Sequence, residues 1–140
     1  METRRTIHID APPERVWSVM SDVERWHEWT ASISKVELLD GSELRASSRA
    51  RVTQPKLPQA VWQVTQLDPG RYFEWENRSP GLRSVGGHGV EPDGDGTLAT
   101  LWIRQTGLMT PILALFYKKL INRYVQMEAD GLKQRSEATA

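Results

Sequence analysis

Residues 110–133 of the chain, TPILALFYKKLINRYVQMEADGLK, decide the fold. Apolar side chains recur there at spacings of three and four, as they do on one face of an α-helix. Thr110 suits an N-cap, Pro111 suits the first helical position, and Gly131 is a stop signal. A helix of about 20 residues spans roughly 30 Å and needs a partner for its apolar face. The predicted apolar stripe comprises Leu113, Phe116, Tyr117, Leu120, Tyr124 and Met127.

The sequence before this helix predicts two short helices and seven strands. Alternation over residues 4–10 predicts a first strand, and Pro12-Pro13 opens a short helix that a second one follows over residues 23–29. Consecutive hairpins indicate an antiparallel sheet, which we expect to curl around the long helix. The six further strands are expected over residues 34–40, 46–54, 60–67, 71–78, 82–91 and 97–105.

The composition predicts one soluble, cytoplasmic domain. Eighteen basic and eighteen acidic side chains in 140 residues cancel, a balance that implies neither nucleic acid nor an anionic membrane as partner. No cysteine is present, and no apolar run approaches the roughly 20 residues of a membrane span. We expect a single domain over residues 1–135 with a frayed tail at 136–140, either a monomer or a homodimer.

The sequence contains no motif for a metal or a nucleotide cofactor. No two histidines have metal-ligand spacing, and neither a GxGxxG motif nor a Walker loop occurs. No Ser, His and Asp order suggests a catalytic triad. We therefore expect no metal and no cofactor.

Four stretches that together span nearly the whole chain carry a resemblance to a known family. They are IHIDAPPERVWSVMSDVERWHEW, QPKLPQAVWQVTQLDPGRYFEWENRSPG, HGVEPDGDGT and RYVQMEADGLKQRSE, beginning at residues 7, 54, 88 and 123. They resemble the polyketide cyclase/dehydrase-like proteins of the START/Bet v 1 (SRPBCC) superfamily. The resemblance implies an α+β helix-grip fold, with a seven-stranded antiparallel sheet around the C-terminal helix and a cavity between them. Members bind lipids, sterols or polyketides, and some catalyse cyclisation or aromatisation.

His88 is the candidate catalytic residue. It shares strand parity with Val90, so both side chains face the helix if Val90 does. An imidazole in an apolar cavity can move protons near neutral pH or hydrogen-bond a ligand carbonyl. The alternative is a histidine satisfied by a neighbouring side chain or water. Gly86-Gly87, just before it, predicts a bulge or a close backbone approach.

Aromatic and uncharged polar side chains on the expected concave face are the candidate ligand contacts. Core packing is the default interpretation for the six tryptophans. Arg49 and Arg51 share one strand face, and we favour an outer, solvated face because a buried unpaired charge is costly. The predicted ligand-binding residues are Trp29, Gln54, Trp62, Phe73, Trp75, His88, Phe116, Leu120 and Tyr124.

Three functions fit these observations. The first is binding of a small hydrophobic ligand between the sheet and the C-terminal helix. The second is a polyketide cyclase or aromatase/dehydratase that uses the same cavity, with His88 moving protons. The third is a protein-interaction module whose cavity has collapsed. Few ionisable groups can be placed inside the cavity from the sequence, so binding ranks above catalysis.

Overall fold

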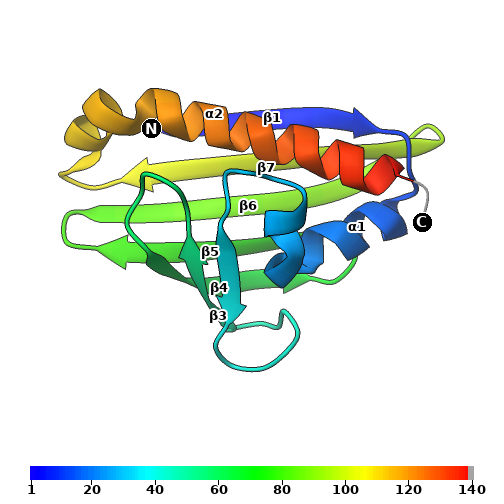
Figure 1. The fold of residues 1–140 in the computed structure, drawn as a ribbon, viewed down its shortest axis with the longest axis horizontal. Coiled ribbons are helices and arrows are strands. Elements are labelled where there is room, and N and C mark those ends of the chain that lie inside the picture. The colour runs from blue at the N-terminus through cyan, green and yellow to red at the C-terminus, as the bar shows by residue number, and fades with distance from the viewer. Residues whose placement is uncertain (139–140) are drawn as a thin grey trace.

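The computed structural model describes residues 1–138 as a curved seven-stranded sheet with one long helix lying along it (Figure 1). The strand order is β1-β7-β6-β5-β4-β3-β2, and every neighbouring pair is antiparallel. This is the predicted α+β helix-grip architecture. The elements are β1 (Glu2–Ile9), α1 (Pro13–Ser21), the 3-10 helix η1 (Val23–Glu28), β2 (Lys35–Leu38), β3 (Arg49–Thr53), β4 (Ala60–Asp68), β5 (Tyr72–Ser79), β6 (Leu82–Asp93), β7 (Gly96–Thr106) and α2 (Thr110–Glu137).

The glycine pair of β6 marks a close approach and not a bulge. β5 and β6 pair in regular register through this region. A Cβ on Gly86 would lie 3.2 Å from the indole nitrogen of Trp75, and one on Gly87 would lie 2.2 Å from the indole of Trp102. Each face of the sheet therefore carries an indole directly over a glycine, and larger residues at these positions would displace the rings.

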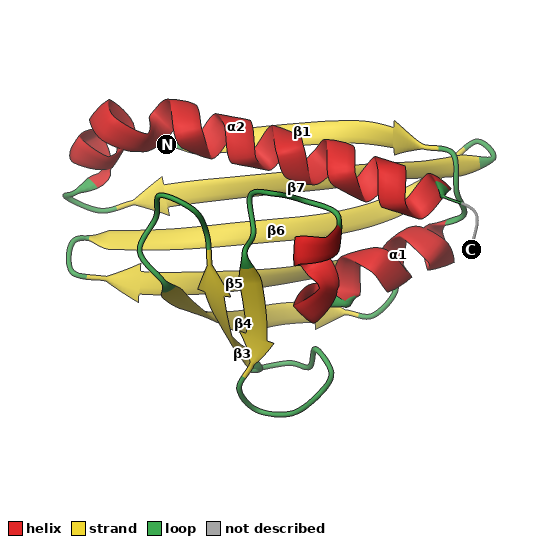
Figure 2. Ribbon diagram, in the orientation of Figure 1, coloured by secondary structure: helices red, strands yellow, loops and turns green. Residues whose placement is uncertain are grey.

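The two short helices close one end of the sheet (Figure 2). Pro12 precedes α1 in an extended conformation, and the helix buries Val16 and Met20. η1 buries Val23 and Trp26, and the Trp26 indole donates a hydrogen bond to the Met20 carbonyl at 3.0 Å. The bond ties the two helices together where they cover the core.

The long helix α2 differs from the prediction at both ends. Its N-cap is Met109, with no side-chain capping bond, so Thr110 is already helical. The helix continues through Gly131 to Glu137, because that glycine is buried and not a terminator. Ser136 and Glu137 are thus helical, and the Ser136 carbonyl accepts a hydrogen bond from Arg15 at 3.4 Å. Residues 139–140 of the expected frayed tail lie outside the described residues.

The buried face of α2 is also rotated from the predicted stripe. Its first buried residue is Ile121, and the exposed fraction of Phe116 is 71%. Ile112, Leu113, Leu115 and Phe116 surround the first turns, so apolar periodicity alone gives no unique face there. The buried residues of α2 are Ile121, Tyr124, Val125, Ala129, Gly131, Leu132 and Ser136.

Gly131 lets α2 approach the segment after η1, and its replacement tests that contact. A Cβ on Gly131 would lie 2.1 Å from the Trp29 carbonyl oxygen, a backbone atom that cannot rotate away. We expect Gly131→Ala to lower the free energy of unfolding by about 2 kcal/mol, because this overlap outweighs the roughly 1 kcal/mol helix preference for alanine. Urea denaturation would measure the change.

The matched control is Gln134→Ala, at an exposed position one turn further along the same helix. It should leave the free energy of unfolding within about 0.5 kcal/mol of the wild-type value. Equal or greater stability of Gly131→Ala would show that the contact does not limit the position of α2.

Candidate ligand cavity

A cavity of about 510 Å³ lies between α2 and the sheet. Apolar side chains form most of its wall, with Trp62 and Ile103 from the sheet and Ile121 and Val125 from α2. Its mouth lies between α2, the β3–β4 connection, the start of β4 and the end of β5, which carry its exposed lining residues Pro58, Gln59, Val61, Arg78 and Ser79. Leu113 and Tyr117 line the cavity from the first half of α2.

A second, smaller chamber of about 70 Å³ adjoins the first. Trp26, Trp75 and His88 line only this inner chamber, which has room for a few water molecules. The two chambers are neighbours because they share wall residues. Those shared residues are Gln54, Trp62, Ile103, Val125 and Glu128.

Glu128 is the acidic side chain at the junction of the chambers. The residue keeps some exposed surface because it borders the cavity, yet protein surrounds its carboxyl group. Burial raises the pKa of Glu128 to about 7, and a hydrogen bond from the Ser32 hydroxyl at 3.3 Å opposes this shift. Ser32 is itself linked to the Thr30 hydroxyl at 2.7 Å. A carboxyl group with a pKa near neutrality can both accept and release a proton under physiological conditions.

His88 lies in an aromatic cage in the inner chamber. Its ring stacks on Phe73 with centroids 4.2 Å apart, and the rings of Trp26 and Trp75 lie 5.3 and 5.6 Å away. Burial lowers the pKa of His88 to about 3, so the imidazole is neutral near pH 7. Its Nδ1 is buried without a hydrogen-bond partner among the described residues. His88 is therefore suited to hydrogen bonding and is a weak base.

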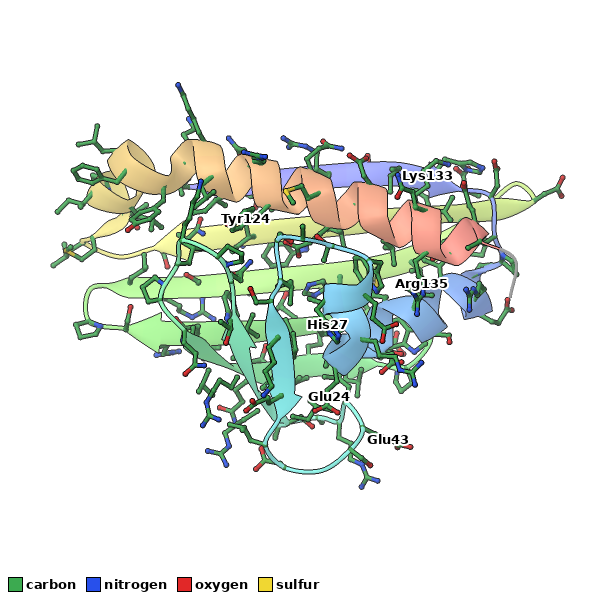
Figure 3. All side chains as sticks on the ribbon, in the orientation of Figure 1. Glu24, His27, Glu43, Tyr124, Lys133 and Arg135 are labelled. Atoms are coloured by element: carbon green, nitrogen blue, oxygen red, sulfur yellow. The ribbon has the colours of Figure 1, made fainter. Side chains whose placement is uncertain are left out.

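Further polar groups line the large chamber. Ser84 and Gln105 are buried on paired positions of β6 and β7, and the Gln105 Oε1 has no partner among the described residues. The Gln54 amide donates to the Ser32 carbonyl at 3.3 Å. Tyr124 extends from α2, and its hydroxyl donates to the Pro55 carbonyl, which fixes the β3–β4 connection against the helix (Figure 3).

The family model described as polyketide cyclase/dehydrase and lipid transport matches residues 1–137. The chain belongs to this family. A comparison with curated proteins gives no match.

Solved structures similar to this family member include two aromatase/cyclases. Zhui from Streptomyces sp. R1128 has a TM-score of 0.79 and 17% identity, over 98% of this chain and 93% of that one. The di-domain StfQ from the steffimycin pathway has a TM-score of 0.76 and 11% identity, over 97% of this chain and 50% of that one. A third structure, TTHA0849 from Thermus thermophilus, has a TM-score of 0.77 and 22% identity, over 97% of each chain. At these identities the likeness shows the fold alone.

In this polyketide cyclase/dehydrase family protein, five of the predicted ligand contacts lie at the cavity. Gln54, Trp62, Trp75, His88 and Tyr124 each line one or both chambers. Whether they contact a ligand stays a prediction. Their side chains reach the cavity because the strands alternate as the sequence indicates, with Val64, Phe73 and Trp75 buried on the concave side.

The other four predicted contacts lie elsewhere. Phe73 is fully buried behind His88 and does not line the cavity. Trp29 borders a separate surface hollow beside Gly131 and Arg135. Phe116 and Leu120, expected in the cavity wall, border an outer groove, because the face of α2 that covers the cavity is rotated toward Ile121 and Val125.

Sequence reasoning missed Glu128, the most perturbed acidic group of the site. The signal was its spacing from Ile121, Tyr124 and Val125, which places it on the same face of the helix. The predicted stripe passes through Met127 instead and leaves Glu128 without a role. Ser84 and Gln105 were also missed, because no local pattern marks a polar residue on a strand as cavity-facing.

The structure also bears on the sequence-based predictions about Arg49 and Arg51, a metal site, a membrane span and an interaction module. Arg49 and Arg51 lie on the outer face, paired with Asp40 at 2.9 Å and Glu37 at 3.0 Å. Within residues 1–138 no three acidic or histidine side chains are grouped to hold a metal ion. Of the helices described, none has the length and apolar character to cross a membrane. The interaction-module hypothesis required a collapsed cavity, whereas this cavity is open.

The raised pKa of Glu128 predicts how stability depends on pH. Between about pH 4.5 and 7 the folded protein retains a proton that the unfolded chain releases, so burial of this group costs more stability as the pH rises. Each unit of pKa corresponds to about 1.4 kcal/mol, and we discount the full shift because the group borders a water-accessible cavity. We expect Glu128→Gln to be about 2 kcal/mol more stable than the wild type at pH 8, and less than half of that at pH 5.

Urea denaturation of both proteins at the two pH values measures this difference. Glu91→Gln, at an exposed position of β6, is the matched control and should follow the wild type at both pH values. A stability gap for Glu128→Gln that does not grow between pH 5 and pH 8 would contradict a buried, protonated Glu128.

Proposed function

We propose that the protein binds one small, largely apolar ligand in the cavity between α2 and the sheet. The observation that carries this proposal is the cavity of about 510 Å³, which is within the usual range for small-molecule sites. Its wall is mostly apolar, and Ser84 and Gln105 within it are buried, so these two groups can orient a ligand with little competition from water. Family membership supports the same general role.

The polar groups narrow the chemistry of the ligand. The unpartnered Gln105 Oε1 accepts a hydrogen bond, and the neighbouring Ser84 hydroxyl can donate or accept one. A protonated Glu128 can donate to a carbonyl or hydroxyl oxygen at the junction of the chambers. This arrangement favours a lipid, sterol or polyketide-like molecule with an apolar body and one or two hydroxyl or carbonyl groups.

Trp62 provides an internal reporter because it lines both chambers. A panel of lipids, sterols and aromatic polyketides can be titrated while tryptophan fluorescence is recorded. A true ligand should change the emission of the wild type, and Trp62→Phe should remove most of that change. Trp17→Phe, whose ring lies outside both chambers, is the matched control and should retain it.

Filling the cavity should weaken ligand binding. Val125→Phe adds volume at the junction of the chambers, so we expect it to weaken the affinity at least about tenfold by excluding the ligand. Leu120→Phe makes a similar change on the outer side of the same helix and should bind as the wild type does. Fluorescence titration gives both affinities, and thermal melts confirm that both variants are folded.

Leu113→Trp is a second blocking variant, because Leu113 lines the cavity at a half-buried position where an indole is more easily accommodated. Wild-type affinity in both Val125→Phe and Leu113→Trp would show that the ligand binds outside this cavity.

A cyclase is the second candidate function, and the raised pKa of Glu128 is the observation that favours it. In an intramolecular aldol cyclisation, a carboxylate at this position would remove a proton from the carbon between two carbonyls. The resulting carboxylic acid would return a proton to the oxygen of the attacked carbonyl. The neutral imidazole of His88 would orient that oxygen by a hydrogen bond, a different role from the proton transfer predicted from the sequence.

With a cyclisable substrate, Glu128→Gln should lower kcat by about 100-fold or more, because the variant cannot transfer a proton. KM should change little, since glutamine keeps the shape of the side chain. The wild-type rate should also show an ionisation near pH 7 that Glu128→Gln lacks. A wild-type rate in Glu128→Gln would remove this residue as the acid/base and leave binding as the function.

A further inference from the structure

An exposed apolar patch lies at the start of α2. The patch consists of five large apolar residues. Leu108 is 92% exposed, Leu115 is 78% exposed and Phe116 is 71% exposed. Among the described residues, Val61 is the one other large apolar side chain of comparable exposure. We call this surface the α2 patch; it comprises Leu108, Met109, Ile112, Leu115 and Phe116.

The basic residues around the α2 patch differ from all others in the described chain. Of the 18 lysines and arginines, 12 pair with a carboxylate. Arg5 donates a hydrogen bond to the Gln126 side chain, and Arg15 donates one to the Arg135 carbonyl. Within residues 1–138, the four without such a partner are Lys56, Lys118, Lys119 and Arg123.

These four cations are grouped beside the α2 patch. Lys56, Lys119 and Arg123 line one outer groove of about 420 Å³ together with Phe116 of the patch. Lys118 precedes Lys119 on the same turn of α2 and is exposed.

Three segments at this end of the molecule contain no acidic residue, and Glu2, at the start of β1 nearby, is paired with Arg4 and Arg104. Residues 105–127, which include the loop before α2 and the first half of the helix, contain no Asp or Glu. The β3–β4 connection over 54–59 and the β5–β6 turn over 79–82 contain none either. The first acidic residue of α2 is Glu128, which faces the cavity. This end therefore carries a local positive charge that the balanced composition conceals.

The α2 patch also adjoins the mouth of the cavity. Met109 donates a backbone hydrogen bond to the Gly81 carbonyl at 2.9 Å, which joins the patch to the β5–β6 turn at one end of the sheet (Figure 1). The end of β5 just before that turn and the β3–β4 connection provide most of the exposed lining of the cavity, and half-buried Leu113 and Tyr117 line it from the first half of α2. A surface that covered the patch would therefore lie next to the cavity mouth.

We propose that the α2 patch and its four cations dock on an anionic lipid surface. Apolar side chains flanked by lysine and arginine are the combination that binds at the headgroup boundary of a bilayer. A second copy of the chain fits less well, because a two-fold interface through the patch would bring the unpaired cations of both copies together. Docking goes beyond ligand binding, since it needs no occupant in the cavity, and it places the mouth beside the membrane.

Sedimentation with lipid vesicles tests the proposal in the absence of any ligand. The wild type should bind vesicles of phosphatidylcholine mixed with phosphatidylglycerol at low ionic strength, and binding should weaken as salt is added. Binding to phosphatidylcholine alone should be much weaker. Lys118→Glu/Lys119→Glu should reduce the partition onto anionic vesicles by about tenfold or more, because each cation near such a surface contributes about a factor of five. Leu115→Ser/Phe116→Ser should also reduce it, by removing the inserted apolar groups.

Arg45→Glu/Arg71→Glu is the charge-matched control. Both arginines are highly exposed and form only long ion pairs of 3.9 Å, and neither borders the α2 patch. This variant changes the net charge by the same amount and should retain most of the wild-type partition. Val125→Phe should dock as the wild type does, so a failure of ligand binding and a failure of docking can be told apart.

Three results would overturn the proposal. The first is a wild type that does not bind anionic vesicles at low ionic strength. The second is an equal loss of binding in the Lys118/Lys119 and Arg45/Arg71 variants, which would indicate attraction by net charge alone. The third is a dimer in analytical ultracentrifugation that Leu115→Ser/Phe116→Ser dissociates, which would show that a second copy covers the patch.

Discussion

The close contact between Gly131 and the backbone of Trp29 sets the position of the long helix. It brings the second half of α2 against the segment after η1, where no side chain could intervene. All residues that α2 buries lie at or beyond Ile121, so this half completes the core. Because a helix of this length is rigid, the first half of α2 extends over the curved sheet without filling the space between them. The cavity therefore results from the close contact between Gly131 and Trp29 at one end of the straight helix α2.

Burial then determines the chemistry of the two titratable groups at the inner chamber. The same loss of hydration raises the pKa of Glu128 and lowers that of His88, since each shift favours the neutral form. At slightly acidic pH both side chains are uncharged, and an apolar ligand can enter without displacing a hydrated ion. Near pH 7 only Glu128 changes charge. The aromatic rings around His88 fix its orientation but give its Nδ1 no partner, so this group can serve a ligand.

The sequence predicts the architecture well because strands and turns follow local rules. Two-residue alternation and glycine- or proline-rich turns indicate all seven strands, and the concave positions of Trp62, Phe73, Trp75 and His88 follow from parity. The rotation of α2 does not follow from the sequence, because apolar residues surround its first turns. A rotation within one turn leaves Tyr117 at the cavity while it removes Phe116, and it brings Glu128 to the cavity in place of Met127. The same local reasoning predicts that the helix ends at Gly131. Only its contact with Trp29, which is distant in sequence, explains why the helix continues.

The exposed apolar side chains of the first turns of α2, unlike Leu113 and Tyr117, do not pack against the core. Leu115 and Phe116 are largely exposed, and lysine or glutamine would serve the helix at least as well as these residues do. Elsewhere the described chain pairs all but two of its basic side chains, Arg5 and Arg15, with carboxylates, so its equal numbers of charges reflect local neutralisation over most of the surface. That neutralisation stops where acidic residues stop, at residues 105–127. The four cations beside these exposed apolar side chains form no ion pair within the described monomer, and docking on an anionic surface would give both groups a partner.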